Sequence, residues 1–596
     1  MKTKDFFKTI ILTMTSLFVA NGIKAQGVTQ FGTPTNQVVF PKGEYAELQD
    51  PNVSDEQSWK IIDKTHVVWA SKNVRYAKNI VPKVSKSSKT HKIVAWKGER
   101  VNAQFLIFGN KDMLLKVAHK GDFANETKTS FVRYVMTDEL NKDGKGACGH
   151  RPDITIFDSS LVADVLDCVS EKLPYRKHTV QPIWVQIQIP QNARKGCYKT
   201  TILVENNDEI VDKLHLNIEV INRALPAPKD WAFHLDLWQN PFAEARYFQV
   251  DPWSNSHLDV MRPTMKLLAK SGQKVITASI MHKPWGGQTQ DYFESMVTWR
   301  KNIDNTWHFD FDVFDCWVEF MMSCGIDKQI NCYSMIPWSL SFKYFDQATN
   351  NFKTIEATPS DSIYTEVWTE MLKQFAAHLK SKGWFEKTTI AMDERPKEQM
   401  LTVFNIIKNA DKDFKVSLAG DWHEELEAEL YDYCIAYRHK FPDEILQKRK
   451  QNGQISTYYT CCTEPYPNTF TFSQPAEAEC LGWYTAHLGL DGYLRWAYNS
   501  YTLEPLLDSR FRSFAAGDCY IVYPEGRSSI RFEKLTEGIQ NFEKIQILKK
   551  EFEQKNQIIK LKKLETLLNQ FSQENLTDKN ITSIVEKANS ELKKLQ

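Results

Sequence analysis

The sequence has no excess of charge of either sign. Its 596 residues include 75 Lys and Arg against 74 Asp and Glu, which leaves a net charge of +1. A protein that gathers nucleic acid through its overall field needs a positive surplus, so we expect no nucleic-acid partner. The composition is otherwise that of globular proteins, with 42% hydrophobic and 25% charged residues, and the length predicts two to four domains.

Motifs of several enzyme classes are also missing. The sequence contains no GxSxG, P-loop or HExxH motif, no CxxC pair and no Cys/His cluster at zinc spacing. Gly144, Gly146 and Gly149 satisfy GxGxxG, but they follow polar residues in a β-rich region, so we interpret them as a loop. We therefore expect neither a metal nor a cofactor.

No apolar run after the N-terminus is long enough to span a membrane. The N-terminus carries three lysines in its first eight residues, a mostly apolar stretch over 9–23 and a small residue at Ala25. This pattern predicts a signal peptide of residues 1–25, cleaved near Ala25, and an exported protein that is periplasmic or secreted. The 11 cysteines are irregularly spaced, which favours mostly buried free thiols, with at most a strained bridge between Cys461 and Cys462.

Residues 26–228 show the two-residue period of half-buried strands. Apolar and polar residues alternate over 183–189 and 214–220, and turn signals at Pro190 and Gly196 precede a further strand at 200–204. Several such strands predict an N-terminal β-sandwich. Pro226 and Pro228 mark its predicted end, because a proline pair extends neither a sheet nor a helix.

From residue 229 short apolar strands alternate with helical stretches. We expect eight strands, at 232–238, 274–278, 329–335, 388–392, 415–419, 433–436, 455–459 and 493–497. They predict a (β/α)8 barrel (a TIM barrel) over 229–548, decorated by hairpins at 296–309 and 340–355. The segment 549–596 is rich in lysine and glutamate, and its apolar stripes favour C-terminal helices packed on the barrel over a partner-binding coiled coil.

A barrel places its catalytic groups at the carboxyl ends of its strands, and the fourth predicted strand ends in Asp393 and Glu394. This is the only Asp-Glu pair that follows a predicted buried strand, where burial could keep one carboxyl protonated. The alternative is that one of the two caps the helix predicted over 396–410. Adjacent carboxylates cannot easily flank a glycosidic bond, but they suit a substrate-assisted route in which a sugar's acetamido oxygen attacks the anomeric carbon.

Aromatic residues are abundant, with 17 Trp, 22 Tyr and 34 Phe, and they fit either a large core or flat platforms for sugar rings. Several lie at predicted strand ends beside amide, imidazole and guanidinium groups that can hold sugar hydroxyls. The candidate substrate-binding residues are Trp238, His282, Trp285, Trp338, Trp422, His423, Tyr459, Asn468, Arg495, Trp496 and Asn499. For the two histidines, a structural role is the alternative.

Four segments occur in order along the chain: 388–396 with the Asp393-Glu394 pair, 491–499, 517–524 and 528–533. Together they resemble glycoside hydrolase family 123, the bacterial β-N-acetylgalactosaminidases. The resemblance implies a β-sandwich followed by a (β/α)8 barrel, and exo-acting, retaining, substrate-assisted removal of terminal β-linked N-acetylgalactosamine from a glycan or glycolipid. It also implies that Asp393 stabilises the acetamido group and that Glu394 is the general acid/base. Two alternatives stay open: a non-catalytic carbohydrate-binding protein, and a retaining glycosidase with a covalent intermediate.

Overall fold

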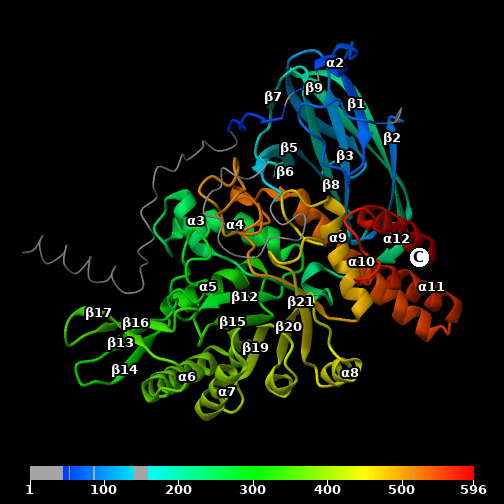
Figure 1. Cartoon of the computed structure of the whole chain (residues 1–596). Helices are drawn as coiled ribbons and strands as arrows, with labels where there is room; N and C mark the ends of the chain where they lie inside the picture. The colour runs from blue at the N-terminus through cyan, green and yellow to red at the C-terminus, as the bar shows by residue number, and fades with distance from the viewer. Residues whose placement is uncertain (1–44, 53, 55, 85–87, 140–158, 513) are drawn as a thin grey trace, which may run out of the picture. The chain divides into compact units, whose positions relative to one another are not determined.

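The computed structural model describes residues 45–596 except 53, 55, 85–87, 140–158 and 513 (Figure 1). The predicted signal peptide and the loop at Gly144–Gly149 lie outside the described residues. The described residues divide into two compact units, one of Pro241–Asp259 and Val275–Tyr433 and the other of 45–240, Val260–Lys274 and Cys434–Gln596. Within the described part, no helix has the length and hydropathy to cross a membrane.

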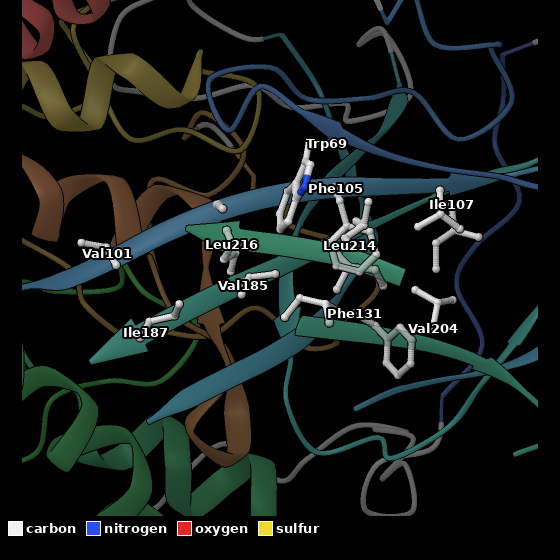
Figure 2. Packing of buried hydrophobic residues seen from close by; sticks show 14 of the residues in the cluster. Trp69, Val101, Phe105, Ile107, Phe131, Val185, Ile187, Val204, Leu214 and Leu216 are labelled. Atoms are coloured by element: carbon white, nitrogen blue, oxygen red, sulfur yellow. The ribbon is translucent and has the colours of Figure 1, made fainter. Parts of the chain in front are cut away.

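The second unit contains the predicted β-sandwich. A six-stranded sheet has the order β1 (His66–Ala70), β3 (Arg100–Phe108), β8 (Val180–Gln188), β5 (Thr127–Thr137), β6 (Ser160–Asp167) and β23 (Ser528–Ser529). A five-stranded sheet has the order β2 (Thr90–Lys97), β10 (Glu209–Ala224), β9 (Gly196–Asn206), β4 (Met113–Gly121) and β7 (Leu173–Tyr175). Both contribute to one core, in which Phe105 and Val185 of the first sheet pack with Val204 and Leu214 of the second (Figure 2). The alternation predicted over 183–189 and 214–220 is thereby confirmed.

Four helices complete the second unit's C-terminal part: α9 (Pro475–Leu488), α10 (Ile530–Gln554), α11 (Ile558–Leu568) and α12 (Ile581–Leu595). Helix α10 runs through residue 548, where the sequence predicts the end of the barrel, and every residue from Ile530 to Ile545 is buried. Its polar side chains have internal partners: Lys534 donates to Glu479 and Glu537, and the amide of Gln540 bonds both the backbone N–H and the carbonyl of Arg100 on β3.

A third sheet has eight strands in the order β11 (His234–Leu237), β22 (Gly492–Arg495), β21 (Ile455–Tyr459), β20 (Asp432–Ala436), β19 (Lys415–Gly420), β18 (Thr388–Met392), β15 (Gln329–Tyr333) and β12 (Val275–Ser279). All eight predicted strands exist. The neighbours β12–β15, β15–β18, β18–β19, β21–β22 and β11–β22 pair in parallel. Because each strand lies beside its neighbours along the chain, this is the strand order of a (β/α)8 barrel. Leu235 of β11 also bridges to Gln273, just before β12.

Helices follow these strands: α3 (Pro241–Phe248), α4 (Asn255–Ala269), α5 (Asp312–Cys324), α6 (Ser362–Lys382), α7 (Lys397–Ala410) and α8 (Asp443–Gln451). The two predicted hairpins are β13 (Thr298–Lys301) with β14 (Trp307–Asp310), and β16 (Ser341–Asp346) with β17 (Asn351–Glu356). They form one four-stranded sheet, because β13 pairs with β16 in parallel. Trp299 of this sheet packs edge-on against Trp368 of α6, with ring centres 4.9 Å apart.

The cysteines are mostly free thiols, as predicted. In the part of the chain that the structure describes, five free cysteines are buried, Cys197 is exposed, and three others are half-buried. Cys462 is disulfide-bonded, whereas its neighbour Cys461 is free, so the vicinal bridge considered from the sequence is wrong.

His257 of α4 gives the first unit a pH-dependent stability. Its imidazole is fully buried, accepts the Trp253 N–H at Nδ1 and donates from Nε2 to the Pro241 carbonyl, and burial lowers the pKa of His257 to about 4. Between pH 6.5 and 4 the unfolded chain therefore binds a proton that the native state does not, so stability falls as the pH falls, by up to about 1.4 kcal/mol per pH unit.

We expect His257→Asn, whose amide oxygen can still accept the Trp253 N–H, to flatten this acid slope. The measurement is the denaturation midpoint of both proteins at pH 6.5, 5.5 and 4.5. The exposed His308 offers a matched control, because His308→Asn should leave the slope unchanged. Equal slopes for wild type and His257→Asn would contradict the prediction.

Candidate active site

The Asp393-Glu394 pair lies directly after β18, all of whose residues are buried. Asp393 is buried, at 7% exposure, whereas Glu394 is exposed. Gly420, at the end of the neighbouring strand β19, lies against the Glu394 backbone, since a Cβ there would be 3.4 Å from the Cα of Glu394. The strand end thus delivers one carboxylate into the protein and the next to solvent.

Three hydrogen bonds hold the Asp393 carboxylate. Arg395 Nε donates to Oδ1 at 2.9 Å and Arg395 Nη2 to Oδ2 at 3.0 Å. The indole Nε1 of Trp338 donates to the same Oδ2 at 2.9 Å. The guanidinium of Arg395 also lies over the Trp338 ring, 4.5 Å from its centre. Asp393, Arg395 and Trp338 therefore form a closed triangle of contacts, which we call the Asp393 clamp.

Neither residue of the pair is the N-cap of the following helix. Helix α7 begins at Lys397 with Pro396 as its N-cap residue, and no side chain bonds its first amides from that position. Of the two interpretations of the pair that the sequence allowed, helix capping is thus wrong. The two residues differ in burial: Asp393 is buried and ion-paired with Arg395, whereas Glu394 is exposed.

Trp338 belongs to the segment that follows β15, and its exposed fraction is 48%. Its backbone N–H donates to the carbonyl of Pro284, at 3.0 Å, in the segment that follows β12. The carboxyl ends of β12, β15 and β18 are thereby joined, because Trp338 contacts both Pro284 and Asp393.

His282, two residues before Pro284 and half-buried, is held by a carboxylate. Its Nδ1 lies 2.5 Å from Oε2 of Glu294, whose exposure is 8%. With Nδ1 donating to this acceptor, Nε2 is the nitrogen that remains for a ligand hydroxyl. Trp285, by contrast, is buried, and its ring packs against Phe293 and Tyr333.

Trp422 and His423 follow β19 and are held by Tyr433. The Trp422 ring stacks on Tyr433 with centres 5.5 Å apart at 20°. The Tyr433 hydroxyl accepts the His423 N–H and donates to the Asp421 carbonyl, each at 2.7 Å. Both predicted residues are half-buried, so each keeps an accessible surface.

The remaining predicted residues belong to the second unit and are mostly enclosed. Arg495 is fully buried and donates to Asp518 at 2.7 Å and to the side-chain oxygen of Asn468 at 2.8 Å. Trp496 is half-buried and donates to Asp518 at 3.3 Å. The other buried members of the predicted set are Trp238, Tyr459 and Asn499. A sugar contact for these residues stays a prediction, because the structure gives them protein partners.

Two residues that the sequence analysis did not single out contact candidate site residues of the first unit: Arg395 contacts Asp393, and Glu294 contacts His282. Arg395 is two positions from Asp393, and a basic residue directly after an acidic pair is a local indication of an ion pair. Glu294 gave no such signal, because it reaches His282 only through the fold. Among the described residues, no three His, Cys, Asp or Glu side chains are grouped as a metal site would require.

Comparisons with known proteins agree with this architecture. The family model described as the catalytic domain of glycoside hydrolase 123 matches residues 238–548, and the model of the N-terminal domain of glycoside hydrolase 123 matches residues 69–206. No curated protein matches the chain by sequence.

Two solved structures illustrate the range of similarity. A family 123 glycoside hydrolase from Clostridium perfringens, described in terms of glycolipid glycan hydrolysis, has a TM-score of 0.78 and 25% identity over 89% of this chain and 98% of its own. A match to a family 5 xyloglucanase of Bacteroides ovatus covers 80% of this chain and 100% of that one, with only 9% identity and a TM-score of 0.29.

Proposed function

Because this chain belongs to glycoside hydrolase family 123, we propose that it is an exo-acting β-N-acetylgalactosaminidase that works by a retaining, substrate-assisted mechanism. The observation that carries the proposal is the unequal placement of the two adjacent carboxylates. Asp393 is buried and held by three hydrogen bonds, while Glu394 is exposed at the same strand end. One is suited to orient a substrate group, the other to exchange protons.

In this mechanism the nucleophile belongs to the sugar. Asp393 accepts the N–H of the 2-acetamido group, which turns the acetamido oxygen towards the anomeric carbon. As that oxygen forms its bond to the carbon, Glu394 protonates the leaving oxygen and the glycosidic bond breaks, which gives an oxazolinium ion. Glu394 then takes a proton from water, whose oxygen opens the ring and leaves the product with the starting anomeric configuration.

A covalent glycosyl-enzyme fits the arrangement less well. That route needs two carboxyls about 5 Å apart on opposite sides of the scissile bond. Asp393 and Glu394 are consecutive residues at the end of a single strand, and Asp393 is engaged by Arg395 and Trp338.

For the natural substrate we propose a glycan or glycolipid that ends in β-linked N-acetylgalactosamine. The similarity to the Clostridium perfringens enzyme, which is described with glycolipid glycans, supports this class. The signal peptide predicted over 1–25 would bring the enzyme to such substrates outside the cytoplasm, as a periplasmic or secreted protein. In the first unit, His282, Trp338, Trp422 and His423 are the candidates for sugar contacts, since each keeps accessible surface.

The test is hydrolysis of aryl β-N-acetylgalactosaminide beside the matching glucosaminide and galactoside. We expect release from the first substrate, little from the second and none from the galactoside, which lacks the acetamido nucleophile. A thiazoline analogue of the oxazolinium ion should inhibit. Turnover of the galactoside, or a trapped glycosyl-enzyme without thiazoline inhibition, would favour the covalent route. Sugar binding without turnover would favour the carbohydrate-binding protein.

The Glu294→Gln variant tests the role of His282. Because a neutral amide holds the imidazole less firmly than the carboxylate does, we expect KM for the galactosaminide to rise by about 3- to 10-fold with little change in kcat. Steady-state kinetics on the aryl substrate give both constants. An unchanged KM would indicate that His282 does not contact the sugar.

A further inference from the structure

We propose that Arg395 is a positioning residue that acts with Trp338 to present one acceptor site of Asp393, on Oδ1, to the acetamido N–H of the substrate. The inference rests on the proposed function and goes beyond it, because it assigns a role to Arg395, a residue that need not touch the sugar.

The argument starts from the acceptor capacity of a carboxylate. Two oxygens offer about four lone-pair sites in the carboxylate plane. In the Asp393 clamp, Oδ2 accepts from Arg395 Nη2 and from Trp338 Nε1, so both of its sites are used. Oδ1 accepts only from Arg395 Nε among the described residues, which leaves one site there. A single acetamido N–H can take this site without breaking any bond of the clamp.

The clamp is rigid because its parts support one another. Arg395 and Asp393 have side-chain exposures of 9% and 10%, and a charge-assisted, two-pronged pair with so little solvent is among the stronger polar contacts in proteins. The guanidinium plane is fixed from a second side by the Trp338 ring, 4.5 Å from its centre. Neither χ1 nor χ2 of Asp393 can change without breaking these contacts.

This rigidity has a catalytic use. The acetamido oxygen attacks the anomeric carbon only when the amide plane is correctly turned, and that plane is set by the direction of the N–H···Oδ1 bond. An Asp393 free to rotate would accept the same N–H in several directions, and most of the bound substrate would then be unreactive. Arg395 therefore contributes mainly to kcat and only weakly to sugar affinity.

The experiment compares Arg395→Met, Arg395→Lys and Trp338→Phe with wild type on aryl β-N-acetylgalactosaminides. We expect Arg395→Met to lower kcat about 100-fold, Arg395→Lys to recover part of that loss, and Trp338→Phe, which keeps the ring but not the N–H, to lower kcat about 5-fold. Because these variants impair the attack by the acetamido oxygen, kcat should fall by the same factor for good and poor leaving groups. Arg300→Met is the control, since the Arg300 Nε bonds the side chain of Asn302 and no other described residue.

A double-mutant cycle separates positioning from a merely structural role. If Arg395 acts through Asp393, the Asp393→Asn, Arg395→Met double variant should be no slower than Asp393→Asn alone, within about threefold. Losses that multiply would overturn the proposal, as would an Arg395→Met enzyme with near-normal kcat. Trp338→Phe changes an exposed residue and guards against a folding defect in the Arg395 variants.

The wild-type measurements distinguish failure of this proposal from failure of the proposed function. If wild type hydrolyses the galactosaminide and is inhibited by the thiazoline, but Arg395→Met behaves identically, only the role of Arg395 is wrong. If wild type neither hydrolyses the galactosaminide nor binds the thiazoline in calorimetry, the proposed function is wrong, and the role of Arg395 is wrong with it.

Discussion

The Glu394→Gln enzyme is expected to hydrolyse β-N-acetylgalactosaminides with poor leaving groups about 10³-fold more slowly than wild type, which is the usual contribution of a general acid. The glutamine side chain has the size of glutamic acid but no proton to give. An alkoxide leaving group must then depart unprotonated. A dinitrophenolate leaves readily without a proton, so the defect on that substrate should be much smaller and limited to the hydration step.

The measurement is kcat/KM over a series of aryl leaving groups of rising pKa, in which the variant should show a steeper dependence than wild type. Glu398→Gln is the matched control, because Glu398 is also exposed and lies in the first turn of α7, four residues further on. A Glu394→Gln enzyme with the wild-type dependence would rule out Glu394 as the acid.

The second large effect is expected for Asp393→Asn, at about 10²- to 10³-fold in kcat/KM. An asparagine must turn its NH2 group towards one side of the clamp. If it replaces Oδ1, it faces Arg395 Nε–H and the incoming acetamido N–H, and if it replaces Oδ2, it faces the N–H groups of Arg395 and Trp338. Either orientation sets donor against donor, so no flip of the amide restores the site.

This defect should differ in kind from that of Glu394→Gln. Because acetamido attack precedes or accompanies departure of every leaving group, we expect the loss to be similar across the aryl series, together with weaker inhibition by the thiazoline. Asp413→Asn, at an exposed residue just before β19, serves as the control. Thiazoline affinity within about threefold of wild type would show that Asp393 does not hold the acetamido group.

Local periodicity was enough to predict most strands, but not their long-range pairing. β18 and β21 begin and end at the predicted residues. β22 begins one residue earlier and ends two residues earlier than predicted. The two hairpins were expected separately, and nothing local indicates that β13 pairs with β16 in one sheet.

The candidate site was predictable in its centre and not in its surroundings. The position of Asp393 and Glu394 follows from the end of a buried strand. Which of them is enclosed depends on Trp338, a residue 55 positions away in sequence, and no pattern near residue 393 reveals that contact. For the same reason no local pattern reveals that Arg495, a predicted sugar ligand, donates to Asp518, 23 residues later.

The pairing of β23 with β6 limits how this protein can be cut or recombined. Ser528 and Ser529 complete the edge of the six-stranded sheet opposite Leu166 and Val165, and Gln540 of α10 satisfies the backbone of Arg100 on β3. A gene fragment that stops at residue 228 would leave that edge and that peptide group unpartnered. The N-terminal sandwich therefore cannot be transferred to another protein by itself. A chimera of this sandwich with another hydrolase would also have to contain the segment from Ser528 to Ile545.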